Sequence, residues 1–554
     1  MILWNLKKTT KKKINSGKEK SKMRMNNSNK REREELHRAI WSIANGLRGS
    51  VDGWDFKQYV LGMLFYRYIS ENITEYINKN EKEAGNEDFD YASIDDDMAI
   101  SIREEIVESK GFFILPSQLF ENICEQVSSK ENLEDLNERL EKIFKSIEES
   151  AVGSKSEENF KGLFDDIDVN SNKLGPTVKK RNERLVKLMN GIAGMKLGSY
   201  KDNSIDTFGD AYEFLMGMYA SNAGKSGGEF FTPQEVSELL TKITLLGKTE
   251  VNKVYDPAVG SGSLLLKFAK ILGKENVRNG FFGQEINITT YNLCRINMFL
   301  HDIGYEKFSI EHGDTLTDPR HWDDEPFEAI VSNPPYSIKW EGSDNGTLIN
   351  DPRFSPAGVL APKSKADFAF IMHCLHWLST NGTAAIVCFP GIMYRSGAEQ
   401  KIRKYLIDNN YVECIIQLPE NLFFGTSIAT CIMVLKKSKM DNNTLFIDAS
   451  KEFKKVTNSN KLTDGSEDEE DNNIKNILSW YEQRKTAEHI SYLAKKSEIE
   501  QNDYNLSVST YVEQKDDQEV IDIKALNEEI KQIVERENIL RQQIDEIILE
   551  IERA

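Results

Sequence analysis

The segment Asn333-Pro334-Pro335-Tyr336 sets an amide, two prolines and an aromatic ring directly after a short apolar run that includes Ala329–Val331. Such a run is typical of a strand buried on both faces. The prolines end it because they lack the N–H donor and fix φ. The motif therefore predicts a rigid turn at the carboxyl end of a buried strand, where open α/β sheets bind ligands. A proline-stiffened surface turn is the simpler alternative.

A second motif, "KVYDPAVGSGSLLLKF" at 253–268, predicts a strand ending at Asp256, a loop of small residues and a helix from about Leu264. Small residues let the backbone approach a ligand closely, and a helix start offers free N–H groups to an anion. Neither the lysine of a phosphate-binding loop nor dinucleotide-binding GxGxxG spacing is present. A smaller anion, such as an amino-acid carboxylate, suits this loop better.

Two further acids follow predicted strands. Glu285 ends the strand in "GFFGQEIN", where an acid can bind ribose hydroxyls, and Asp314 lies near the end of "FSIEHGDTL", where it can accept from an exocyclic amine. Either acid alone is as easily a surface carboxylate. Their order after a glycine-rich loop favours a nucleoside-containing ligand.

Four stretches together carry a family resemblance: "DPAVGSGS", "NPPY", "GGEFFTPQEV" at 227–236, and "ELHRAIWSIANGLRGSVDGWDFKQYVLGMLFYRYISE". The first two resemble amino-methyltransferases that use S-adenosylmethionine. All four, in the order in which they occur along the chain (the "ELHR" stretch first, then "GGEFFTPQEV", "DPAVGSGS" and "NPPY"), resemble the modification (methyltransferase) subunit of type I restriction-modification systems, an adenine-N6 DNA methyltransferase. The resemblance covers about residues 33–512. The family often has Cys, Thr and Gly where this loop has Val259, Ser261 and Ser263, which are also small.

The resemblance implies S-adenosylmethionine as cofactor and no metal ion. It assigns to the cofactor site Glu229, Phe230, Phe231, Thr232, Pro233, Gln234, Asp256, Gly260, Ser261, Gly262, Ser263, Glu285 and Asp314.

The resemblance also implies how the proline turn acts on adenine. The side-chain oxygen of Asn333 and the carbonyl of Pro334 each accept one N6 hydrogen, and fixed dipoles stabilise the charge that develops on nitrogen. Pro335 stiffens the turn, and Tyr336 stacks on the base once it leaves the helix. Phe423 or Phe424 is a candidate for a second aromatic wall, with core packing as the alternative.

Strands and helices alternate from about residue 204 to 437, which predicts an α/β fold with a parallel sheet. The resemblance implies that this fold is a Rossmann-like methyltransferase domain. The expected boundaries are a basic disordered tail at 1–32, a helical domain at 33–200, the methyltransferase domain at 201–450, an acidic flexible insertion or linker at 451–475, and a helical C-terminal region at 476–554. In that last region the 4-3 spacing predicts a coiled-coil seam, interrupted at Glu537, with an ordinary helix packed on its own domain as the alternative. The seam residues are Leu526, Ile530, Ile533, Leu540, Ile544, Ile547 and Ile551.

The net charge of the chain is −18, although residues 1–31 hold nine Lys, two Arg and one Glu. The remaining residues therefore carry a net charge of −28, which is unfavourable for binding DNA phosphates without a partner. The resemblance implies double-stranded DNA, a specificity subunit that reads sequence, a restriction subunit, and two copies of this chain per complex. We expect the C-terminal helix to dock to the specificity subunit.

The remaining sequence features indicate a cytoplasmic protein. None of the six cysteines forms a CxxC pair, and no apolar stretch or signal peptide suggests a membrane. His373 and His376 are three residues apart on a predicted helix, where packing against the sheet is favoured over a metal site. The alternatives to a DNA methyltransferase are a protein-glutamine amide methyltransferase and a non-catalytic assembly scaffold.

Overall fold

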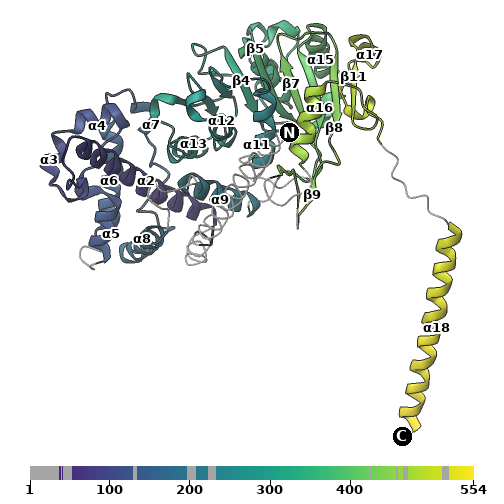
Figure 1. Ribbon diagram of the computed structural model, residues 1–554, viewed down its shortest axis with the longest axis horizontal. Helices are drawn as coiled ribbons and strands as arrows, with labels where there is room; N and C mark the ends of the chain where they lie inside the picture. Colours follow the sequence, from purple (N-terminus) through teal and green to yellow (C-terminus); the bar gives the residue numbers. More distant parts are fainter. Residues whose placement is uncertain are drawn as a thin grey trace, which may run out of the picture. The chain divides into compact units, whose positions relative to one another are not determined.

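The computed structural model describes residues 37–38, 40, 53–128, 134–195, 207–222, 232–423, 427–456, 459–465, 472–514 and 523–553. The chain divides into two compact units, Met1–Val512 and Glu513–Ala554. The first contains a large sheet and a helical domain, and the described part of the second is mainly the helix α18 (Ile523–Arg553) (Figure 1). Within these ranges no helix is both long and apolar enough to cross a membrane.

The described part of the first unit holds a nine-stranded sheet in the order β11-β8-β6-β7-β5-β4-β1-β2-β3. Strands β7 and β11 run antiparallel to their neighbours, and the other pairs are parallel. This mixed sheet confirms the predicted α/β class, although the sequence suggested only parallel strands. The strand bounds are β1 Val254–Asp256, β2 Phe281–Glu285, β3 Phe308–His312, β4 Phe327–Ser332, β5 Leu378–Cys388, β6 Val412–Gln417, β7 Cys431–Lys436, β8 Thr444–Asp448 and β11 Ser491–Ala494.

Helices cover both faces of the sheet, so its central strands are apolar on both sides. Val254 and Ala329 belong to one buried cluster, whereas Tyr255 and Ile330, the next residues along the same strands, belong to another. The first cluster includes side chains of α11 (Gln234–Thr244), α12 (Ser263–Leu272), α13 (Ile288–Leu300) and α16 (Asn473–Gln483). The second includes side chains of α14 (Asp367–Trp377), α15 (Ala398–Asp408) and α17 (Lys496–Gln501).

The helical domain is built around α2 (Gly53–Glu83), the long helix in its centre (Figure 1). Its stretch from Tyr59 to Tyr66 is buried throughout, as expected for a helix with neighbours on all sides. It contacts α5, α8, α9 and α13. The other described helices of this domain are α3 Asp96–Ile100, α4 Arg103–Lys110, α5 Phe120–Ser128, α6 Leu136–Ser150, α7 Glu157–Phe160 and α8 Val178–Ala193; α9 (Thr207–Asn222) contacts both α2 and α13.

Arg295 on α13 joins the helical domain to the sheet. Its buried guanidinium donates hydrogen bonds to the carbonyls of Glu158 (2.9 Å), Asn159 (3.2 Å) and Lys161 (3.0 Å), and it lies over the ring of Tyr291. A buried cation needs such partners, because leaving water without them costs several kcal/mol, roughly. The helical domain is therefore held to the part that contains the sheet by directed hydrogen bonds as well as by a shared apolar core.

Two predicted boundaries differ from the structure. The region predicted as helical from 476 includes β11, which pairs with β8 as an edge strand, and the separate unit begins only at Glu513. The predicted flexible segment 451–475 contains a short hairpin, β9 (Lys454–Lys455) with β10 (Asn460–Lys461). Thr463 and Glu452 of this segment form hydrogen bonds with Asn473 at the start of α16, which the polar composition alone does not reveal. The basic tail at 1–32 lies outside the described residues.

We expect Arg295→Ala to lower the free energy of unfolding by about 3 kcal/mol, because three partly buried hydrogen bonds and the packing of a buried side chain are lost. Urea unfolding followed by circular dichroism measures the change. The control is Arg278→Ala, which removes an exposed ion pair with Glu250 and should cost less than about 1 kcal/mol. Equal losses in the two variants would show that the junction does not depend on Arg295.

Candidate active site

The glycine-rich loop and the proline turn meet because β1 and β4 are neighbours. Their parallel register pairs Val254 with Ala329, so Asp256 at the end of β1 lies beside the end of β4. There the Ser332 hydroxyl donates to Asp256 Oδ1 at 2.8 Å, and Asn333 follows immediately. Strands β2 and β3 continue on one side and β5 on the other. This is a topological switch point, where open sheets form a crevice for ligands.

The loop after β1 is shaped by two glycines with positive φ, Gly260 (55°) and Gly262 (81°). A Cβ on Gly262 would lie 2.9 Å from the Cys294 sulfur, so neither the backbone nor the space suits a larger residue. The Asn297 amide donates to the Ser261 carbonyl at 2.7 Å and holds the loop against α13. Helix α12 then begins at Ser263, one residue before the predicted start.

Asp256 is fully buried, and only one of its two carboxylate oxygens has hydrogen-bond partners among the described residues. Oδ1 accepts from the Ala258 N–H (3.0 Å) and from Ser332, whereas Oδ2 has no partner among the described residues. Burial, reinforced by the nearby Glu285 charge, raises the pKa of Asp256 to about 7, although its hydrogen bonds oppose the shift. A buried, half-satisfied carboxyl of this kind is typical of a ligand site.

Glu285 reaches the same loop from the end of β2. Its carboxylate accepts from the Gly260 N–H at 3.1 Å and the Asn287 N–H at 2.9 Å, and burial raises its pKa. The strand therefore ends where the sequence predicts. The hydrogen bond from Gly260 joins the end of β2 to the glycine-rich loop.

Asp314 lies two residues beyond β3, which ends at His312. Its neighbour Thr315 donates to the Pro257 carbonyl at 2.6 Å, so the third loop also adjoins the first. Asp314 itself lines an open depression of about 750 Å³ that also involves Lys339 and Trp340 from the segment after the proline turn.

The amide of Asn333 is held at both ends. Its Nδ2 donates to Thr232 Oγ1 at 3.2 Å, and the Tyr336 hydroxyl donates to its Oδ1 at 2.7 Å. Thr232 and Pro233 precede α11, and the amide of Gln234 at its first position is buried with no partner among the described residues. The structure thus brings Thr232, at the start of the predicted cofactor segment that it describes, to the proline turn. Glu229, Phe230 and Phe231 lie outside the described residues.

Tyr336 is half-buried against the core, and burial raises the pKa of its hydroxyl. The next residue, Ser337, has a φ of 52°, and its N–H donates to the Asp367 carboxylate at 3.2 Å. Ser332 and Asp367 both support the turn, and sequence reasoning missed both. Ser332 is marked only by its place before Asn333, and Asp367 is 30 residues from its partner, so no local pattern reveals it.

One of the two candidates for a second aromatic wall lies in the core. Phe423 is only 4% exposed and belongs to the buried cluster that contains Leu418 and Leu422, because an aromatic side chain gains more from the core than from a wet edge. It is therefore not available to a base here. Phe424 lies outside the described residues.

The histidine pair packs as expected. His373 is buried, with Nε2 2.9 Å from the Tyr255 hydroxyl and Nδ1 3.1 Å from the Arg353 guanidinium, and burial lowers its pKa. The described ranges hold no group of three side chains suited to a metal ion.

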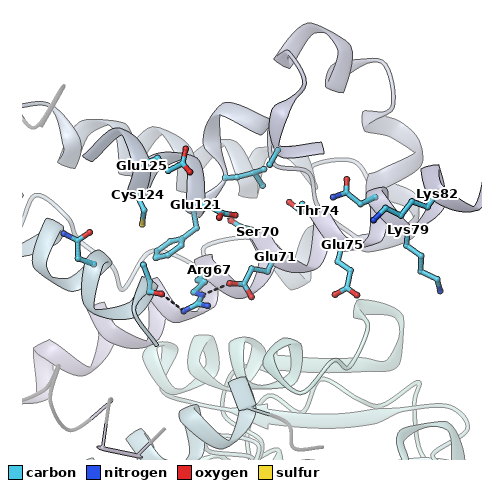
Figure 2. A pocket seen from close by; sticks show the side chains of 16 residues that line it. Arg67, Ser70, Glu71, Thr74, Glu75, Lys79, Lys82, Glu121, Cys124 and Glu125 are labelled. Atoms are coloured by element: carbon cyan, nitrogen blue, oxygen red, sulfur yellow. Dashed lines mark hydrogen bonds and ion pairs between the residues drawn. The ribbon is translucent and has the colours of Figure 1, made fainter. Parts of the chain in front are cut away.

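A cavity of about 840 Å³ lies in the helical domain (Figure 2). Its walls come from α2, α5 and α8 and carry both signs of charge. Arg67 pairs with Glu71 at 2.6 Å and also donates to carbonyls at the end of α8 (Figure 2). None of the predicted site residues lines it.

Comparison with known proteins fits this geometry. Residues 203–520 match the family model for N-6 DNA methylase, and residues 36–192 match the HsdM N-terminal domain. The type I restriction enzyme MpnII methylase subunit of Mycoplasma pneumoniae is 48% identical over 534 residues, which cover 94% of this chain and 97% of the relative. The chain belongs to the methylase subunits of type I restriction enzymes.

Other relatives agree with this assignment of the methylase subunit. The MjaVII methylase subunit of Methanocaldococcus jannaschii is 28% identical, over 93% of this chain and 84% of that one. The solved methyltransferase subunit of a type I restriction-modification system from Streptococcus thermophilus is 36% identical, with a TM-score of 0.77 over 87% of this chain and 100% of that chain. The family recognised from the four sequence motifs is confirmed, and the subunit is an enzyme of the N6 DNA methyltransferase family.

Proposed function

We propose that this methylase subunit transfers a methyl group from S-adenosylmethionine to N6 of a specific adenine in double-stranded DNA. The observation that carries the proposal is the position of Asn333. It directly follows β4 at the switch point, and Thr232 and Tyr336 fix its amide beside the loop of Asp256. An acceptor for an amine and a site for an amino-acid cofactor therefore share one crevice.

The residues present suit this cofactor, which supplies a methyl group activated on a sulfonium. The unpartnered Oδ2 of Asp256 can accept from the ammonium group of its amino-acid part. The buried Gln234 amide at the start of α11 can donate to the carboxylate, aided by the helix terminus. Glu285, held by two backbone N–H groups, can accept from ribose hydroxyls, and Asp314 from the adenine amine of the cofactor. Tightly turned glycines let the backbone close on the ligand.

Asn333 and Pro334 prepare the target amine. The N6 lone pair is delocalised into the adenine ring, so the amine is a weak nucleophile. Two acceptors that each take one N6 hydrogen turn the lone pair toward the methyl group and stabilise positive charge on nitrogen, by roughly 3 kcal/mol for one fixed dipole. Asn333 Oδ1 has two lone pairs, so it can accept from the amine and from Tyr336 together. Pro335 keeps both oxygens rigid.

The same proposal includes the assembly. We infer that two copies of this subunit act with a specificity subunit and that a restriction subunit joins for cleavage. The excess of acidic residues beyond residue 31 means that a partner must provide much of the phosphate contact. Helix α18 is the candidate docking element, because its seven seam residues, Leu526 to Ile551, are 46–70% exposed in its own unit.

The two alternatives have less support. A protein-glutamine methyltransferase would use the same proline turn, but the family match covers both the catalytic and the helical parts with DNA methylases. A scaffold would not need Asn333 held by two hydrogen bonds.

We expect Asn333→Ala to abolish methylation while cofactor affinity stays within about twofold, because Asn333 contacts the target amine and not the cofactor. Asn350→Ala, an exposed asparagine on the following segment, is the matched control and should retain full activity. The complex with the specificity subunit is assayed with labelled cofactor on duplex DNA, and methylated adenines are mapped by sequencing. Substantial activity of Asn333→Ala would exclude the proposed role.

Cofactor affinity should rise with pH through the pKa of Asp256. Above about pH 7 this carboxyl is charged in the free protein and attracts the ammonium group, and below it the proton must first leave. Calorimetry should show roughly a 5–10-fold gain in S-adenosylmethionine affinity from pH 6 to 7.5. Asp256→Asn should bind weakly and flatten this dependence, whereas an equal slope in both proteins would assign the titration to another group.

The raised pKa of Asp256 has the opposite effect on the stability of the free protein. Its contribution to the free energy of unfolding is fully present below its ordinary pKa and is lost as pH rises through about 7. Cofactor binding should therefore protect the fold most strongly at neutral to alkaline pH.

Truncation after Val520 removes α18 and should leave the first unit folded and able to bind cofactor, because that unit ends at Val512. Without the seam the subunit should fail to co-purify with the specificity subunit and fail to methylate DNA. Pull-down and gel-shift assays test both. Normal co-purification of the truncated chain would move the docking element to the helical domain.

A further inference from the structure

Thr232 lies between the two halves of the site. It lies two residues before the start of α11, and its side chain is 6% exposed. Its Oγ1 accepts a hydrogen bond from Asn333 Nδ2 at 3.2 Å, although the two residues are 101 positions apart in the sequence. No hydrogen bond in the described part of the chain uses the hydrogen of its hydroxyl. That hydrogen is therefore available to an acceptor on the cofactor side.

The amide of Asn333 has two orientations that exchange its oxygen and nitrogen. Both neighbours are hydroxyls, Thr232 and Tyr336, and each hydroxyl can donate or accept. These two contacts alone therefore permit either orientation. Only one orientation is productive, since the target amine needs an oxygen and would be repelled by the Nδ2 hydrogens.

An anion next to Thr232 removes this ambiguity. Once the threonine hydrogen is donated to a carboxylate, Oγ1 can only accept, and Nδ2 is the donor that it meets. Oδ1 is then directed toward the target base. Bonds linked in such a chain also strengthen one another.

We propose that Thr232 is a positioning residue that couples cofactor occupancy to recognition of the target adenine, by fixing the amide of Asn333. The proposal rests on the proposed function, because the acceptor of the Thr232 hydrogen is the carboxylate of S-adenosylmethionine. Methyl transfer then requires no further movement of the amide. By reciprocity the target base strengthens cofactor binding by the same factor.

The experiment uses the complex with the specificity subunit and compares Thr232→Val, Thr232→Ala and Thr232→Ser. Removing the hydroxyl should lower kcat at least tenfold at saturating cofactor and DNA, and serine should restore it to within about threefold of wild type. Thr241→Val is the matched control. This threonine is equally buried on α11 and donates only to the Ser237 carbonyl (2.8 Å), so kcat should not change.

Coupling is measured with S-adenosylhomocysteine and a duplex that carries 2-aminopurine at the target position. In wild type the cofactor product should increase the fluorescence of the extruded base and tighten DNA binding; valine and alanine should lose this increase, and serine should keep it. A change in cofactor Kd alone, with kcat and coupling intact in both hydroxyl-free variants, would overturn the proposal and leave Thr232 a simple cofactor ligand.

The failure of the underlying function has a separate signature. If the wild-type complex binds S-adenosylhomocysteine but methylates no adenine, the proposed function fails and the coupling proposal fails with it. If wild type methylates adenine and the hydroxyl-free variants are equally fast, only the coupling proposal is overturned.

Discussion

Parallel pairing of β1 with β4 is the constraint on which the site depends. It brings Asp256 and Ser332 within a hydrogen bond, although they are 76 residues apart, and so places a cofactor loop beside an amine-binding turn. Helices on both faces of the sheet keep these strand ends in register, since a shift by one residue would reverse every buried side chain. The chemistry is then performed by short loops on a rigid support.

The buried carboxyl of Asp256 shows the energetic side of this arrangement. The fold tolerates a group whose charged form is disfavoured and which has one unsatisfied oxygen. Such a group destabilises the free protein and favours a bound cation. The surrounding glycines, which no larger residue could replace without strain, serve the same end by removing bulk where a ligand must lie.

Sequence alone predicted the features that depend on local pattern. Strand β2 ends at Glu285 and helix α12 starts beside Leu264, because prolines, glycines and apolar runs mark strand and helix ends directly. It did not reveal the contact of Thr232 with Asn333 or the edge strand β11, since these arise from packing between distant segments. Phe423 was ambiguous for the same reason: an aromatic residue after a loop suits a site or a core equally, and only the fold decides.

The link through Arg295 has a consequence for how such subunits diversify. The guanidinium belongs to α13 beside the sheet, and the three carbonyls that accept its hydrogen bonds belong to α7 and the residue that follows it, in the helical domain. If the two parts were separated, Arg295 would lose its acceptors and the three carbonyls would lose their donor. Recombination that exchanged only one of the two parts between relatives would have to carry both the arginine and the matching backbone turn. We therefore expect the two segments to be exchanged only together, as one module.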